Sequence, residues 1–441
     1  MLRFAPSPTG DMHIGNLRAA IFNYILAKQR NEKFLIRIED TDMARNIPGK
    51  DKEILSLLNL FGLFWDSLVY QSHNFSKHQQ FAEFLLQNNK AFYCYCSKEF
   101  LEQKKQEAIE QKIPFRYDDS WAEICKDSTK KPVIRLRGSQ KPITYRDEIK
   151  GEITFEPNEL DSFVIIREDG IPTYNFACAC DDMIYDIDYI VRGEDHVSNT
   201  PKQLLIRQSL GYDKHIQFAH LPIILGQDGK KMSKRDRASS VVWLLEEGFL
   251  PVAISNYLIA MGNAVPHEIF TLSEAIEWFD IKKIAKSPVK FDLAKLRFIN
   301  HAHLKNLNES DLSMLLDSSS TPNLSLGALA RIYLEEASTL NELREKIEAI
   351  FAPKDIAKLY EGQDFSKECM ILYNILCAKK QNLPLEYEEF KQLLMKESNL
   401  KGKAFFKPLR IVLSGASCGP ELHQTYPYLR LMIDKILSLK N

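Results

Sequence analysis

The chain has 441 residues, of which 45% are hydrophobic and 27% are charged, and its formal net charge is −1. This composition is typical of a globular protein with room for about two to four domains. The net charge excludes a surface that is basic all over, so any basic surface for nucleic acid must be local. The longest nearly apolar stretch, residues 57–65, is far shorter than the roughly 20 residues of a membrane-spanning helix.

The first 40 residues are predicted to form a strand, a helix and a second strand. Residues 2–5 (LRFA) are typical of a short strand, and from Leu17 onward apolar residues recur at helical spacing. Residues 33–40 (KFLIRIED) alternate, with Phe34, Ile36 and Ile38 on one face. This order indicates a βαβ unit and hence a parallel sheet.

The pattern changes over residues 80–174, where the short strand-like runs PVIRLR, ITYRD and DSFVIIRED are separated by Gly, Pro and charged clusters. We interpret this range as an inserted α+β module. The α/β pattern resumes at residues 185–196, and a helix follows that we expect Thr200 to cap, Pro201 to begin and Gly211 to end. From about residue 240 the apolar periodicity is helical, and we expect no strand there.

The compartment is indicated by the N-terminus and by the cysteines. The first residues lack the basic head and apolar run of a signal peptide. The eight cysteines are scattered through a long chain, which favours reduced thiols over a disulfide framework. We therefore expect a cytoplasmic protein.

Two motifs stand where a nucleotide could bind. Residues 5–20 (APSPTGDMHIGNLRAA) place a Pro and Gly turn before a helix, whose N–H groups and dipole suit phosphate, with His13 and Asn16 as donors and Gly15 leaving room for a base. Residues 226–235 (GQDGKKMSKR) form a basic loop able to cover a triphosphate. Alone, the first is equally consistent with an ordinary capped helix and the second with a solvated turn, but their combination favours a site for nucleotide phosphates.

These motifs resemble the HIGH and KMSKS signatures of the class I aminoacyl-tRNA synthetases. The segments RFAPSPTGDMHIG, RIEDTD, PTYNFA, VRGEDHVSNTP and GKKMSKRD stand in the order found in bacterial glutamyl-tRNA synthetases. The similarity continues through GKAFFKPLRIVLSGASCGPEL, so it covers essentially the whole chain.

The resemblance implies an α/β fold, with a Rossmann-type parallel sheet in the catalytic domain and an all-α C-terminal region. The catalytic domain would comprise residues 1–79 and 175–239, and residues 80–174 would be the inserted module that binds the acceptor end of tRNA. Residues 240–306 would form a helical stem-contact domain, and residues 307–441 the anticodon-binding region.

The reaction implied is the activation of L-glutamate by ATP with Mg²⁺, followed by transfer to the 2′-hydroxyl of the terminal tRNA adenosine. Such chemistry relies on positioning and on cations and donors at the phosphates. The resemblance assigns this role to His13, Asn16, Lys231 and Lys234. The expected ATP-binding residues are Pro8, Gly10, His13, Gly15, Asn16, His196, Lys231 and Lys234.

The resemblance also places a glutamate site. Arg3 and Arg192 would read the γ-carboxylate, which an arginine fork matches well, and Glu39 would meet the amino group. The complete expected set is Arg3, Ser7, Glu39, Arg45, Tyr174 and Arg192. A plain ion pair between Arg3 and Glu39 is the alternative, and we assign Cys178 no polar role.

Cys94 and Cys96 raise the question of zinc, because some relatives place C-x-C before a further ligand pair. Here Tyr117 is present, a Trp or Ser stands where a thiolate is expected, and Cys125 comes late. Zinc needs four well-placed ligands, so we expect no bound metal.

Three other functions are less consistent with the sequence or are disfavoured by it. A glutaminyl enzyme usually carries PEPNG where this chain has PSPTG, and a shortened tRNA-modifying relative would lack everything after about Asn306. A retired RNA-binding relative is disfavoured by His13, Lys231 and Lys234. The acceptor, tRNA(Glu), tRNA(Gln) or both, is left open, and we expect a monomer.

Overall fold

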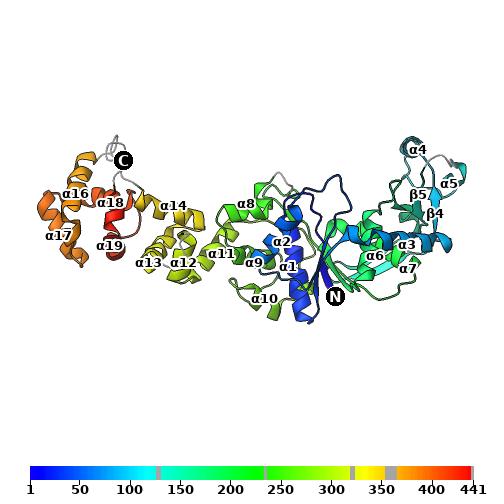
Figure 1. Ribbon diagram of the computed structural model, residues 1–441, viewed down its shortest axis with the longest axis horizontal. Coiled ribbons are helices and arrows are strands. Elements are labelled where there is room, and N and C mark those ends of the chain that lie inside the picture. The colour runs from blue at the N-terminus through cyan, green and yellow to red at the C-terminus, as the bar shows by residue number, and fades with distance from the viewer. Residues whose placement is uncertain (126–130, 233–235, 318–322, 353–364, 439–441) are drawn as a thin grey trace. The chain divides into compact units, whose positions relative to one another are not determined.

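The computed structural model describes residues 1–125, 131–232, 236–317, 323–352 and 365–438 (Figure 1). The chain divides into two compact units. The first comprises Met1–Trp243 and Ser255–Asp292, and the second comprises Leu244–Ile254 and Leu293–Asn441. Over the described residues, none of the helices has the length and apolar character needed to cross a membrane.

A seven-stranded sheet in the order β3-β2-β1-β9-β10-β6-β7 forms the centre of the first unit. Its strands are β1 (Leu2–Phe4), β2 (Phe34–Ile38), β3 (Ser67–Tyr70), β6 (Ile143–Asp147), β7 (Gly151–Phe155), β9 (Tyr189–Gly193) and β10 (Gln217–Leu221). Neighbouring strands from β3 to β6 pair in parallel, and β7 is antiparallel to β6. The predicted parallel sheet is confirmed.

Helices cover both faces of this sheet. They are α1 (Ile14–Gln29), α2 (Lys50–Leu60), α3 (Phe75–Gln87), α6 (Tyr174–Ile184) and α7 (Thr200–Ser209). In Figure 1, α1 and α2 lie to one side of the strands, and α3, α6 and α7 to the other. All five residues of β2 are therefore buried, Arg37 included, as is usual for a parallel strand covered on both faces. The predicted second strand is confirmed, and Leu35 and Arg37 on its other face are buried as well as Phe34, Ile36 and Ile38.

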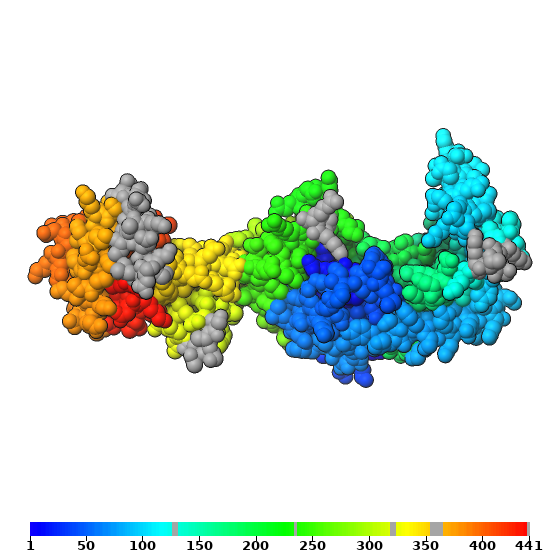
Figure 2. Space-filling view, turned by 45° about the horizontal axis from the view of Figure 1, so that its top comes forward, coloured from blue at the N-terminus to red at the C-terminus, as the bar shows by residue number. Residues whose placement is uncertain are grey.

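A smaller antiparallel sheet, β4-β5-β8, lies within the range predicted as an insertion. Its elements are β4 (Ala91–Cys94), α4 (Lys98–Glu110), α5 (Trp121–Ile124), β5 (Val133–Leu136) and β8 (Phe163–Ile166). Figure 2 shows α4, in cyan, projecting from the rest of the first unit. Strands β6 and β7 belong to the same range of sequence but pair within the main sheet.

The helix α7 begins at Thr200, one residue earlier than predicted, and Asn199 takes the cap position. Further on, β11 (Ile224–Leu225) pairs in parallel with β12 (Val289–Lys290), so the expectation of no strand after residue 240 was wrong. A two-residue strand is too short to show a period in the sequence. The helices of this stretch are α8 (Val241–Glu246), α9 (Pro251–Ala260) and α10 (Leu272–Trp278).

From residue 293 the described part of the chain is helical, as predicted. The helices are α11 (Leu293–Asn306), α12 (Glu309–Leu316), α13 (Leu324–Tyr333), α14 (Leu340–Phe351), α16 (Ser366–Lys379), α17 (Tyr387–Ser398), α18 (Lys403–Ser414), α19 (Leu422–Leu431) and α20 (Ile433–Ile436). The start of α14 shows how the sequence marks where a helix begins, because Thr339 and Glu342 form a reciprocal capping box.

Candidate active site

A cavity of about 520 Å³ opens at the carboxyl ends of β1 and β9 and at the start of α1. Strands β2 and β3 lie on one side of β1, and β9 and β10 on the other, so the winding of the sheet reverses here. Ligands of open parallel sheets bind at such a point. The predicted site residues that line the cavity are Arg3, Ser7, Gly10, His13, Gly15, Asn16, Glu39, Tyr174, Arg192, His196 and Lys231.

Two of the described residues that were predicted for the site, Pro8 and Arg45, are not among those that line it. The carbonyl oxygen of Pro8 accepts a hydrogen bond from the Ile47 N–H, at 2.9 Å. Arg45 is exposed over 74% of its side chain and pairs with Asp42 at 2.6 Å. Lys234 lies outside the described residues.

The first turn of α1 forms one wall of the cavity. His13 caps the helix, and its Nδ1 accepts the Gly15 N–H at 3.0 Å. A Cβ atom on Gly15 would lie 3.2 Å from that nitrogen, so any larger residue here would press on the capping ring. The residues after the basic loop return to this turn, because His13 forms a bridge with Ser240. The two sequence motifs therefore lie against one cavity.

Lys231 lines the same cavity from the basic loop. Its Nζ lies 3.5 Å from Asp195 Oδ2, and both side chains are more than half exposed. Such a pair contributes little in water, so it leaves the ammonium group available to an anion.

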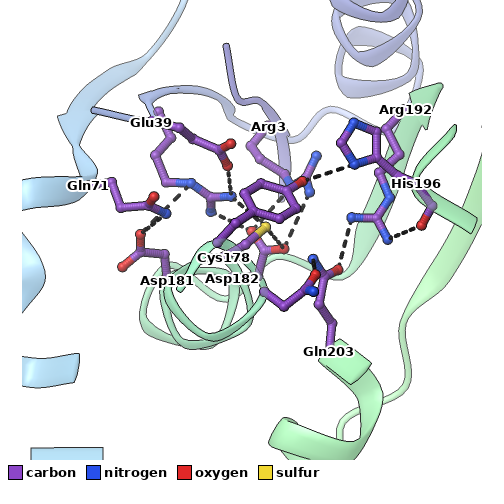
Figure 3. A network of polar contacts seen from close by, with 12 residues as sticks. Arg3, Glu39, Gln71, Cys178, Asp181, Asp182, Arg192, His196 and Gln203 are labelled. Atoms are coloured by element: carbon purple, nitrogen blue, oxygen red, sulfur yellow. Dashed lines mark hydrogen bonds and ion pairs between the residues drawn. The ribbon is translucent and has the colours of Figure 1, made fainter. Parts of the chain in front are cut away.

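A buried network of charges forms the floor of the cavity (Figure 3). Asp182 on α6 accepts hydrogen bonds from Arg3 at 3.2 Å and 3.4 Å and from Arg37 at 2.5 Å. Arg37 also donates to Glu39, at 3.0 Å, and to the Cys178 sulfur, at 3.1 Å. Burial alone raises the pKa of the Asp182 carboxyl, but the two guanidinium groups outweigh it and hold that pKa well below its usual range.

Cys178 therefore has a polar contact, contrary to our expectation. Its thiol remains neutral, because burial and then the charge of Asp182 raise its pKa to about 12. Sequence reasoning also missed Arg37 and Asp182. Their signal was present in the sequence: a charged residue stands inside the apolar strand FLIRI, and two acids follow the apolar segment FACAC.

Arg192, at the end of β9, lines the same cavity as Glu39 and has a different environment from Arg3 (Figure 3). Its guanidinium donates to His220 Nε2 at 3.2 Å, Gln203 Oε1 at 2.9 Å and Thr200 Oγ1 at 2.8 Å. In the described part of the chain no carboxylate pairs with it. A buried cation with neutral partners is suited to receive a carboxylate.

His196 adjoins Arg192, and its Nδ1 lies 3.3 Å from the hydroxyl of Tyr174. Burial, and then the charge of Arg192, lower the pKa of His196 to about 4. The imidazole is therefore neutral at physiological pH and acts as a hydrogen-bonding partner.

Cys94 and Cys96 meet Tyr117 in the smaller sheet. The Tyr117 hydroxyl donates to Cys94 Sγ at 3.1 Å and lies 3.7 Å from Cys96 Sγ, which also contacts the Trp121 carbonyl oxygen. Burial raises the pKa of Cys96 to about 12, so this thiol is protonated. Across the described ranges, no cluster of three or more His, Cys, Asp or Glu side chains has the arrangement of a metal site.

Comparison with known proteins gives the family. Residues 1–298 match the family described as tRNA synthetases class I (E and Q), catalytic domain, and residues 293–429 match the anticodon binding domain. The chain belongs to the class I aminoacyl-tRNA synthetases of this group. The resemblance to the class I aminoacyl-tRNA synthetases that the sequence motifs indicated is thus confirmed.

Relatives agree over the whole length. The chain is 65% identical to glutamate–tRNA ligase 2 of Helicobacter hepaticus, over 100% of both chains, and 57% identical to a glutamyl/glutaminyl-tRNA synthetase of Helicobacter pylori, also over 100% of both. The crystal structure of a glutamate tRNA ligase from Elizabethkingia meningosepticum, in complex with its amino acid, has the same fold, with a TM-score of 0.80, 24% identity and 99% of each chain covered.

Proposed function

We propose that this chain is an enzyme that activates L-glutamate with ATP and transfers it to tRNA. The observation that carries the proposal is the meeting of the HIGN turn and the basic loop at one cavity, beside a buried arginine that has neutral partners. The 65% identity to a glutamate–tRNA ligase over the full chain supports it.

In the first step the α-carboxylate of glutamate attacks the α-phosphorus of ATP, and pyrophosphate leaves. The residues proposed to stabilise the developing charge are His13, Asn16 and Lys231, together with Lys234. Mg²⁺ would arrive on the phosphates of ATP and supply further positive charge to them. In the second step the 2′-hydroxyl of the terminal adenosine attacks the carbonyl carbon of the glutamyl-adenylate and loses its proton. The bond from that carbon to the phosphate breaks, and AMP leaves.

The amino acid would lie between the charged floor and Arg192. Arg3 already shares Asp182 with Arg37, whereas Arg192 has only neutral partners, so the geometry favours Arg192 as the main reader of the γ-carboxylate. Glu39, from the end of β2, is available to the ammonium group. Among the described residues, the contacts of Arg45 with Asp42 and of Pro8 with Ile47 do not support the roles assigned to them.

The acceptor is proposed to be tRNA(Glu), with tRNA(Gln) as the alternative. The H. pylori relative, whose name joins both amino acids, keeps this alternative open. Charging of purified tRNA(Glu) and tRNA(Gln) with labelled glutamate distinguishes the two. We further propose a cytoplasmic monomer without zinc, with the four-part domain division given above.

The activity is tested by pyrophosphate exchange with tRNA present, across glutamate concentrations. Removing one partner of a buried carboxylate costs about 2 to 5 kcal/mol, so Arg192→Ala should weaken glutamate use by at least tenfold and leave the KM for ATP nearly unchanged. If neither Arg3→Ala nor Arg192→Ala changes the glutamate dependence, the carboxylate is read elsewhere. A chain that binds tRNA but exchanges no pyrophosphate would be the retired relative.

A further inference from the structure

Arg192 is held from behind by two residues that do not line the cavity. His220 on β10 pairs with Arg192 in the parallel register of β9 and β10, and Asp147 ends the next strand, β6. Arg192 Nε lies 3.2 Å from His220 Nε2, and His220 Nδ1 lies 2.7 Å from Asp147 Oδ2. His220 is fully buried and Asp147 is 1% exposed.

The chemistry of these atoms decides where the proton of His220 lies. An arginine Nε–H can only donate, so His220 Nε2 must present its lone pair. The imidazole proton therefore sits on Nδ1 and is donated to Asp147. Burial lowers the pKa of His220, which keeps the ring neutral and its Nε2 free to accept.

Asp147 is itself fixed in place. Its Oδ1 accepts hydrogen bonds from the backbone N–H groups of Ile149 and Lys150, at 2.9 Å and 2.8 Å. Its Oδ2 also accepts one from the backbone N–H of His220, at 3.0 Å. Burial raises the pKa of this carboxyl, but the bonds from His220 and from the backbone outweigh that effect and lower it. The carboxylate is thus an acceptor that cannot turn away from His220.

We propose that Asp147 and His220 are positioning residues for Arg192. Asp147 keeps His220 in the Nδ1–H form, and the lone pair on His220 Nε2 then orients the guanidinium of Arg192. Because the imidazole is neutral, it leaves the positive charge of Arg192 available to the side-chain carboxylate of the substrate. A carboxylate in direct contact with Arg192 would hold it equally well but would neutralise it. The inference rests on the proposed role of Arg192 and extends it to two residues outside the cavity.

Kinetics provide the first test. A hydrogen bond to a charged group is worth one to two powers of ten, so His220→Leu should raise the KM for glutamate on the order of 10- to 100-fold, with kcat and the KM for ATP within about twofold. His220→Gln can still offer an acceptor oxygen and should recover part of the loss. Thr144→Val is the matched control, because Thr144 lies on the same strand as Asp147 but is exposed, and its hydroxyl bonds Thr154 at 2.8 Å.

The proton position provides the second test, which is independent of activity. In the full chain labelled with ¹⁵N-histidine, long-range ¹H–¹⁵N spectra report the tautomer of each ring, and the signal absent from His220→Gln belongs to His220. The Nδ1–H form supports the proposal, and the Nε2–H form or a charged ring overturns it.

The two tests separate this inference from the proposed function. If Arg192→Ala weakens glutamate use and His220→Leu does not, the positioning role is refuted and the function stands. If Arg192→Ala has no effect, the role of Arg192 in binding glutamate is refuted. The tautomer then still shows whether His220 Nε2 accepts a hydrogen bond from Arg192.

Discussion

Two buried arginines of the cavity differ in how their charge is compensated. Arg3 shares the carboxylate of Asp182 with Arg37, whereas Arg192 is surrounded by neutral acceptors. The first arrangement stabilises the fold, because each charge has a partner. The second leaves a charge that a substrate can satisfy, so we assign stability to Asp182 and specificity to Arg192.

The Asp182→Asn change tests the first of these assignments. It leaves Arg3 and Arg37 without their shared counter-ion, so the free energy of unfolding should fall by about 3 to 5 kcal/mol. The protein has four tryptophans, Trp65, Trp121, Trp243 and Trp278, all in the first unit, so fluorescence in urea reports that unit alone.

The matched control for Asp182 is Asp186→Asn, which removes an exposed pair with Lys214. Surface pairs contribute about 0 to 1 kcal/mol, so this variant should unfold close to the wild type. Equal unfolding midpoints for both variants would show that the buried network does not hold the unit together.

Acid should destabilise the first unit through His196. Its pKa is lowered to about 4 by burial and by Arg192, so between pH 6.5 and pH 4 the unfolded chain binds a proton that the native chain does not. Stability therefore falls as the pH falls through this window. In urea titrations from pH 7 to 4.5, His196→Asn should show a weaker loss, and His220 should account for part of the remainder. An identical pH dependence would contradict the lowered pKa.

At the scale of elements, the site is built from segments that leave the carboxyl ends of parallel strands. Residues 5–13 follow β1, Glu39 and Asp40 follow β2, and the short helical segment Glu194–Asn199 follows β9. Because parallel strands all end on one edge, segments far apart in sequence converge without long connections. The cavity is a consequence of this topology.

This topology also sets what could be predicted. The βαβ start and the helical second unit follow from periodicity, and the convergence of His13 with Lys231 was implied by the resemblance of two local motifs to a known family. The pairing of β6 with β10, and with it the position of Asp147 behind His220, depends on contacts across more than 70 residues that no local pattern encodes. Arg37 was missed because the alternation within β2 does not show that both faces of this strand are buried.

Lys231→Ala tests the basic loop. The lysine is proposed to contact phosphate in the transition state, so pyrophosphate exchange should slow by about 10², with tRNA affinity nearly unchanged. Lys230→Ala is the control, because this neighbour is exposed and does not line the cavity. Equal losses in both variants, or an equal loss of tRNA binding, would assign the loop a docking role.

At the scale of the whole molecule, a net charge of −1 means that an RNA partner must be met by local basic surfaces. The second unit has such a surface, lining a cavity of about 490 Å³. It combines cations with aromatic and imidazole rings, and its lining residues are Tyr387, Lys391, Lys403, Phe406, Lys407, Arg410, Glu421, Leu422 and His423. Phe406 is 43% exposed, which suits stacking on a base.

The double variant Lys403→Ala/Lys407→Ala tests this surface. Two lost phosphate contacts should weaken tRNA binding on the order of tenfold and make the dependence of log affinity on log salt shallower by about 0.7 to 0.9 per contact. Both effects are measured by the fluorescence anisotropy of labelled tRNA at salt concentrations from about 50 mM to about 200 mM. Lys346→Ala, on α14 and paired with Glu336, is the control that should change neither. Weakened binding with an unchanged salt slope would mean that the two lysines shape the helix α18 and do not meet phosphate, and the aromatic residues would then have to carry the contact.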